Sequence, residues 1–179
     1  MRFHLTELEG LVMIEPQPQD DARGFLSRTY CEREFDAAGL GIRWVQQNHT
    51  LTKGAGSVRG LHYQREPYPE AKLVRCLSGR VLDVAVDIRP ESGTFGKWAA
   101  RELSGENRCA LYIPTGFAHG FQCLTECCEL LYLMSDFYSP EFAAGICWND
   151  PVVGIAWPLP VEGLSDGDKE LPTLAEIIP

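Results

Sequence analysis

Short apolar runs recur about every ten residues along this chain, and glycine or proline separates most of them. The 179 residues include 17 glycines and 12 prolines. This spacing is typical of β-barrels and β-sandwiches and predicts an all-β fold. The expected strands are residues 11–14, 24–30, 44–48, 72–77, 81–88, 98–103, 110–113, 120–124 and 129–134. Ser78-Gly79 is expected to form a hairpin turn between two of these strands.

Helical signals are few. Residues 32–38 are good helix formers and are followed by Gly39, which typically ends a helix, so they predict one short helix. We expect a helical turn at 140–144 and another at 174–177. Residues 151–179 are rich in Pro, Asp and Gly and are expected to wrap the barrel as a C-terminal arm. Nothing resembling a linker or an internal repeat divides the chain, so residues 1–179 are expected to form a single domain.

The charge and hydropathy of the chain exclude two classes of partner. The formal net charge is -9 and the pI is about 4.9, which argues against a nucleic-acid partner because such proteins present a basic face. Apolar runs fall short of the roughly 18 residues that a membrane span needs. Residues 1–6 carry no long apolar segment, so we expect a cytoplasmic protein without a membrane partner.

Seven cysteines raise the question of a metal site. Cys123, Cys127 and Cys128 lie close in sequence, but they lack a second CxxC pair and a histidine at zinc-motif spacing. We therefore interpret the cysteines as small buried apolar residues of a reduced protein.

The segment Arg59-Gly60-Leu61-His62-Tyr63-Gln64 is the strongest candidate for chemistry. Lys72 follows His62 by ten positions, and two cations with a histidine in strands that lead into a core are costly unless a ligand or carboxylates compensate them. A histidine titrates near neutral pH and can act as a base, while a lysine can stabilise a developing enolate oxygen. If the segments that contain His62 and Lys72 are neighbouring strands of one barrel, these residues predict proton abstraction next to a carbonyl.

A second histidine, His119, lies in Pro114-Thr115-Gly116-Phe117-Ala118-His119, which matches the second motif of cupin barrels. The first cupin motif would supply a His-x-His pair, and this chain has His62-x-Gln64 instead. Because one ligand of that pair is missing, we expect no metal cofactor. His119 is either a substrate contact or a polar residue lining the barrel.

Two further features remain open at this level. Asp83 and Asp87 alternate on one face of a strand, so Asp83 either orients a histidine, neutralises Arg75 or forms a structural ion pair. Tyr132 either packs in its strand or points into a cavity, where its hydroxyl can donate a proton to a carbanion.

Taken in order, these motifs resemble the nucleotide-sugar 3,5-epimerases of deoxysugar biosynthesis, typified by dTDP-4-dehydrorhamnose 3,5-epimerase. The resemblance covers almost the whole chain. The matching segments are residues 21–25, 45–48, 58–64, 72–75, 79–84, 86–89, 92–96, 113–121, 138–140, 148–151, 155–158 and 164–168.

The resemblance implies a cupin-like jelly roll that forms a homodimer by strand exchange and uses neither a metal nor an organic cofactor. It implies a nucleotide-diphosphate sugar as substrate, with inversion at C3 and/or C5 beside a C4 ketone. His62 matches the base, Asp168 its orienting carboxylate, Tyr132 the acid and Lys72 the lysine beside the C4 oxygen. The positions that match substrate contacts are Arg23, Gln47, Asn48, Arg59, His119 and Tyr138.

Two positions depart from the family pattern. The family usually has Glu five residues after the position of Arg23 and three residues after that of Pro140, where this chain has Arg28 and Ala143. Both positions belong to the substrate surround. The resemblance favours a dTDP-linked 4-dehydro-6-deoxyglucose as substrate, but losing both acids predicts weaker discrimination for a thymine nucleotide.

Four alternatives remain. The first is an epimerase acting at one carbon, and the second an epimerase of a GDP-, CDP- or UDP-linked sugar. The third is a 3,4-ketoisomerase on the same barrel, against which the Arg-Gly-Leu-His and Leu-Ser-x-x-Asp matches speak. The fourth is a non-catalytic cupin that binds a nucleotide sugar.

Overall fold

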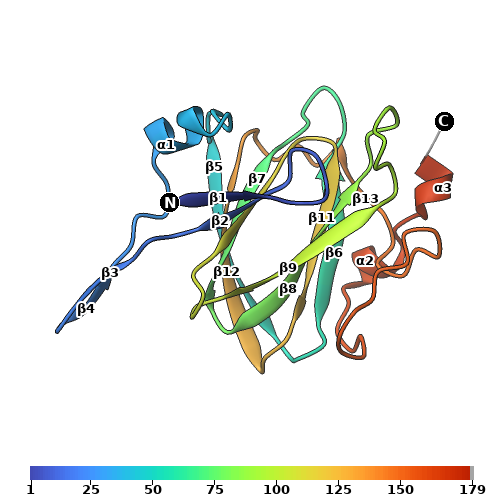
Figure 1. Cartoon of the computed structure of the whole chain (residues 1–179). Coiled ribbons are helices and arrows are strands. Elements are labelled where there is room, and N and C mark those ends of the chain that lie inside the picture. The colour runs from blue at the N-terminus through green and yellow to red at the C-terminus, as the bar shows by residue number, and fades with distance from the viewer. Residues whose placement is uncertain (178–179) are drawn as a thin grey trace.

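Two antiparallel sheets face each other in the computed structural model, which describes residues 1–177 (Figure 1). The larger sheet has the spatial order β1 (Arg2–Leu5), β2 (Val12–Glu15), β10 (Ala110–Ile113), β7 (Lys72–Ser78), β12 (Cys127–Met134) and β5 (Gln46–Lys53). The smaller sheet has the order β13 (Ala143–Gly145), β6 (Val58–Gln64), β11 (Phe117–Cys123), β8 (Arg80–Asp87) and β9 (Trp98–Ser104). The predicted all-β, cupin-like jelly roll is confirmed, with 41% of residues in strands and 8% in helices.

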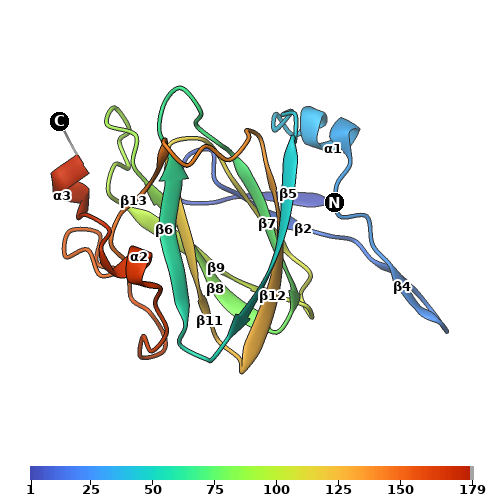
Figure 2. The ribbon, with the colours of Figure 1, turned by 180° about the vertical axis from the view of Figure 1, so that it is seen from behind.

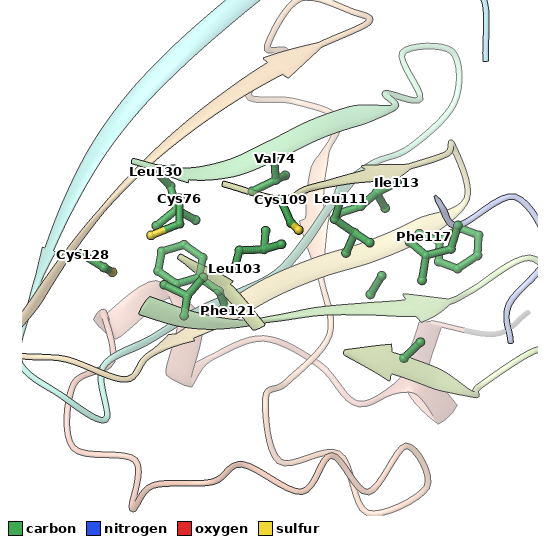
Figure 3. Packing of buried hydrophobic residues seen from close by; sticks show 14 of the residues in the cluster. Val74, Cys76, Leu103, Cys109, Leu111, Ile113, Phe117, Phe121, Cys128 and Leu130 are labelled. Atoms are coloured by element: carbon green, nitrogen blue, oxygen red, sulfur yellow. The ribbon is translucent and has the colours of Figure 1, made fainter. Parts of the chain in front are cut away.

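The main core lies between the two sheets because alternate residues of each strand point inward. Val74 and Cys76 of β7 face Phe117 and Phe121 of β11 across this layer (Figure 3). Five of the seven cysteines are buried, and all seven are free thiols, in agreement with their interpretation as small apolar residues. Each fully buried large side chain contributes roughly 1.5–3 kcal/mol relative to an exposed one.

The chain passes from sheet to sheet at the turn between β7 and β8, so the predicted hairpin at Ser78-Gly79 is wrong. β7 pairs with β10 and β12, whereas β8 pairs with β9 and β11. Gly79 has a φ of 73°, and a Cβ there would overlap the carbonyl oxygen of Cys127. A tight turn between apolar strands indicates a change of direction, but which strands then pair depends on contacts distant in sequence.

The other expected elements are mostly confirmed, with boundaries shifted by a few residues. Helix α1 (Glu32–Ala37) and helix α3 (Leu174–Ile177) form where predicted. The helical turn expected at 140–144 is wrong in its second half, because Ala143 begins β13 and pairs with Gln64 of β6. Strands β1 and β3, and helix α2 (Asp166–Lys169), were not predicted.

Two segments lie outside the barrel. The hairpin of β3 (Gln19–Asp21) and β4 (Gly24–Leu26) projects away from it, with Phe25 and Leu26 54% and 74% exposed (Figure 1). The C-terminal segment runs along the outer side of the smaller sheet, as predicted, and carries α2 together with the predicted α3 on the side opposite α1 (Figure 2). Within residues 1–177, no helix has the length and apolar character needed to cross a membrane.

Candidate active site

A histidine and a carboxyl group meet where the C-terminal segment crosses β6. His62 Nε2 lies 2.7 Å from Asp168 Oδ1, and the backbone N–H of Gly60 donates to Asp168 Oδ2 at 3.3 Å. Asp168 belongs to α2, whose first turn is fixed by a hydrogen bond from the Asp168 N–H to the Ser165 hydroxyl oxygen. Because Asp168 is acceptor-only when ionised, it selects the tautomer of His62 that carries its proton on Nε2. The lone pair on Nδ1 is then available as a base.

Two glycines let β6 and β11 approach closely beside this pair. Gly60 has a φ of 133°, and a Cβ on it would lie 2.5 Å from the Cα of Gly120. The register of β6 and β11 shifts near Gly120, and His119 lies opposite His62. Glycine is therefore required in the Arg-Gly-Leu-His motif, since any side chain would separate the strands that carry the two histidines.

Lys72 and Tyr132 lie on the opposite wall of the barrel. Lys72 is on β7 and Tyr132 on β12, both in the larger sheet, whereas His62 is on the smaller one. The prediction that the His62 and Lys72 segments are neighbouring strands is therefore wrong. Strand alternation turns Lys72 to the same side as the core residue Val74, and Lys72 Nζ donates to the His62 carbonyl oxygen at 3.2 Å. The two sheets thus place the candidate base and the candidate acid across a cavity from each other.

His62, Lys72, Tyr132 and Asp168 line two adjoining parts of one cavity. The wider part has a volume of about 670 Å³ and the narrower part about 240 Å³. Together they have the size of a ligand-binding cleft. An enclosed polar group in such a cleft interacts more strongly with a bound substrate than it would in water.

The surroundings of His62 favour its neutral form. Partial burial lowers the pKa of His62 below its usual value, the hydrogen bond and charge of Asp168 oppose this, and the charges of Lys72 and His119 lower the pKa further. The net shift is downward, which favours the unprotonated imidazole. An unprotonated imidazole is the state required of a general base.

The narrower part of the cavity contains His119 and Arg59. His119 is buried, and its Nε2 lies 3.0 Å from Asp83 Oδ1. Of the roles open to Asp83, the structure therefore supports orienting a histidine. Arg59 Nε donates to the Thr52 hydroxyl at 2.8 Å, which directs the guanidinium along the cavity edge.

The wider part of the cavity contains further predicted substrate contacts, but Gln46 lines it where Gln47 was predicted. Asn48, Tyr138 and Ala143 line it, but Gln47 does not. Gln46 takes that place, because β5 alternates and its odd-numbered residues are exposed on the other face of the sheet. The alternation of a strand is the signal that distinguishes these two glutamines.

Comparison with known proteins shows the family of this chain. A sequence model of the dTDP-4-dehydrorhamnose 3,5-epimerases matches residues 5–176. The chain belongs to this epimerase family. The dTDP-4-dehydrorhamnose 3,5-epimerase of Methanothermobacter thermautotrophicus is 46% identical over 158 residues, which cover 88% of this chain and 84% of that protein.

Two solved structures of similar proteins contain sugar nucleotides. A dTDP-6-deoxy-D-glucose-3,5-epimerase from Legionella pneumophila, in complex with dTDP-4-keto-L-rhamnose, has a TM-score of 0.93 and 39% identity, over 99% of this chain and 94% of that chain. A 3′-monoepimerase from Streptomyces bikiniensis, in complex with dTDP-quinovose, has a TM-score of 0.90 and 36% identity, over 96% of this chain and 87% of that chain. This epimerase-family chain is thus an isomerase.

Two predicted substrate contacts of this epimerase-family chain, Arg23 and Arg28, lie outside the cavity. Arg23 is on the projecting β3–β4 hairpin, 90% exposed and paired with Asp21. Arg28 pairs with Glu34 at 2.7 Å and lines a separate hollow of about 600 Å³ near Met1. The expectation that both bear on the substrate is therefore not met within one chain, because the hairpin extends away from its own barrel. Of the two departures from the family pattern, only Ala143 changes this cavity.

The cupin metal position is occupied by a structural amide. Gln64 donates to the carbonyl oxygens of Tyr68 and Phe137 and accepts from the Ser139 N–H at 2.6 Å. These bonds hold the loops that border the cavity. Among residues 1–177, no cluster of three or more His, Cys, Asp or Glu is arranged to hold a metal ion.

Proposed function

We propose that this chain inverts C3 and C5 of a dTDP-linked 4-dehydro-6-deoxyglucose without a cofactor, as a single cytoplasmic domain. The observation that carries the proposal is the His62–Asp168 pair facing Lys72 and Tyr132 across one cavity in a member of this family. The similar structures bound to dTDP-4-keto-L-rhamnose and dTDP-quinovose support a dTDP sugar as the ligand.

The proposed proton transfer follows from the two walls of the cavity. A C4 ketone acidifies the C–H bonds at C3 and C5. His62 Nδ1 removes one of these protons, the electron pair moves to the C4 oxygen, and the Lys72 ammonium stabilises the enolate. Tyr132 then donates its hydroxyl proton to the carbon from the opposite face. Inversion requires an acid and a base on opposite faces, which is what side chains from facing sheets provide.

We also propose that the substrate site is completed by a second copy of the chain. The β3–β4 hairpin holds Arg23 away from its own cavity and exposes Phe25 and Leu26. An exposed two-stranded arm with apolar side chains is suited to exchange in a symmetric dimer. In such a homodimer Arg23 of one subunit would reach the diphosphate bound to its partner.

Solvent exchange tests the proposed activity. The enzyme is incubated in D₂O with dTDP-4-dehydro-6-deoxyglucose, and deuterium at C3 and C5 is followed by NMR. Incorporation at both carbons is expected. If no deuterium enters either carbon while the sugar nucleotide still binds, the chain is a binding protein.

A second candidate function is epimerisation at C3 alone. It is favoured by the similarity to the 3′-monoepimerase, whose fold superposes at a TM-score of 0.90. Both functions need the same base, acid and lysine, so the fold does not separate them. Deuterium at C3 without deuterium at C5 would select this candidate.

A further inference from the structure

Glu70 is a buried carboxyl group in the cavity wall that the proposed proton transfer does not use. It precedes β7 by two residues and is only 9% exposed. Ala71, between Glu70 and Lys72, packs with Leu73 in a hydrophobic cluster on the outer side of the larger sheet. Its N–H donates to the Ser135 hydroxyl at 2.8 Å and its carbonyl oxygen accepts from the Ser135 N–H at 3.0 Å, which holds the backbone in place. Alternation then turns Glu70 and Lys72 to the same side, toward the cavity.

The two carboxyl oxygens of Glu70 have different surroundings. Oε1 lies 3.2 Å from Lys72 Nζ. Oε2 is buried, and no group within residues 1–177 donates a hydrogen bond to it. A buried acceptor without a donor is costly, and such groups in a binding cavity are commonly completed by a ligand. The chemistry that completes a carboxyl oxygen is a hydroxyl or an N–H.

We propose that Glu70 determines substrate specificity by accepting, at Oε2, a hydrogen bond from the hydroxyl group next to the substrate's ketone. This inference rests on the proposed function, in which Lys72 binds the C4 oxygen. In a 4-keto-6-deoxyhexose the C3 hydroxyl is the one donor on a carbon adjacent to C4, since C5 carries a methyl group and the ring oxygen. The C3 hydroxyl and the C4 oxygen are neighbours in the substrate, as Glu70 and Lys72 are in the cavity wall, so each oxygen can face one of the two side chains.

Enolate formation strengthens this match. When the C3 proton leaves, C3, C4 and their two oxygens become coplanar, so one plane contains the hydroxyl that faces Glu70 and the oxygen that faces Lys72. Glu70 then recognises a planar intermediate that has a donor beside its oxyanion. An interaction made more fully in the intermediate than in the ground state raises the rate as well as the affinity.

The test compares two substrates, the 4-keto-6-deoxy sugar nucleotide and its counterpart lacking the C3 hydroxyl. Deuterium incorporation at C5, which both substrates share, gives kcat/KM for each. The wild-type enzyme is expected to favour the hydroxylated substrate by about 10- to 100-fold, the range for a hydrogen bond to a charged group. In Glu70→Ala the preference is expected to fall within about threefold of unity.

A purely structural role for Glu70, such as holding Lys72 in place, would lower both rates equally and leave the ratio unchanged. An unchanged ratio overturns the proposal. Glu70→Gln keeps the shape of the side chain but has one acceptor for two donors, so it should also reduce the ratio and serves if the alanine variant does not fold. Glu102→Gln, an exposed position on β9, is the matched control and should retain the wild-type ratio. Absence of exchange in the wild-type enzyme would instead refute the proposed function.

Discussion

His62 Nε2 and Asp168 Oδ1 lie 2.7 Å apart although 106 positions separate the two residues in sequence. The carboxyl group is brought there by α2, a helix of four residues in the C-terminal segment. The pairing fixes which imidazole nitrogen carries the proton and leaves Nδ1 available as the base.

Replacing His62 by alanine should abolish exchange while leaving the fold intact. The imidazole is half-exposed in a cavity, so its loss removes the base and little packing. The expected decrease in kcat/KM is about 10²–10⁴-fold, measured by deuterium incorporation together with circular dichroism. His4→Ala, an exposed histidine on β1, is the control. Activity within about tenfold of wild type would show that another group is the base.

Replacing Asp168 by asparagine should alter the pH profile. Asp168 raises the pKa of His62 against the larger effect of burial, so removing its charge should lower that pKa further. The acidic limb of kcat/KM, which reports protonation of the free enzyme's base, should therefore move to lower pH. The maximum should also decrease by at least about tenfold because the tautomer is no longer fixed. Asp166→Asn, an exposed neighbour in the same helix, should change neither quantity.

Acid stability should depend on Asp87. Burial alone would raise the pKa of this carboxyl group, but hydrogen bonds from Arg89, Ser92 and Thr94 outweigh it and lower the pKa to about 2. Its contribution is therefore present above about pH 4 and is lost as the pH falls through about 2. Asp87→Asn should reduce the free energy of unfolding at pH 7 by about 2 kcal/mol and much less near pH 2, as measured by urea titration. An equal loss at both pH values would contradict this linkage.

A mixed dimer should test whether Arg23 acts on the partner's site. Arg23→Ala and His62→Ala should each form an inactive dimer. If Arg23 completes the partner subunit's cavity, one site of a mixed dimer has both residues intact, and an equal random mixture should recover about one quarter of wild-type activity. Sedimentation should show a dimer at micromolar concentration. No recovery in a verified mixed dimer would place Arg23 outside the partner's site.

Restoring an acid at Ala143 should change nucleotide selectivity. Ala143 lines the wider part of the cavity, whereas Arg28 does not. A glutamate at 143 can pair with a polar group of one base, whereas a base without that group leaves the carboxylate unpaired. We expect Ala143→Glu to raise the preference for dTDP over UDP, CDP and GDP sugars by about tenfold in kcat/KM. If Arg28→Glu alone produces that change, the nucleotide is read near Met1 and not at β13.

Local residue patterns were enough to predict the fold class and most of the chemical groups. Apolar runs with period two between glycines and prolines predicted most strands of both sheets, because alternation and turn residues are local properties. The Arg-Gly-Leu-His segment predicted a base near a cation for the same reason, because that prediction depends only on residues that are adjacent in the sequence.

How these parts combine became evident from the three-dimensional arrangement of the strands. The chain crosses between sheets after β6 and again at Gly79, and the first crossing places His62 and Lys72 on facing walls and not on paired strands. The alternation of side chains along β5 places Gln46 in the cavity and Gln47 on the other face of the sheet. Arg23 leaves its own site because β3–β4 projects from the barrel. Contacts between distant segments determine which strands pair, which side chains of a strand face the cavity and in which direction a hairpin projects. Local residue patterns do not encode those contacts.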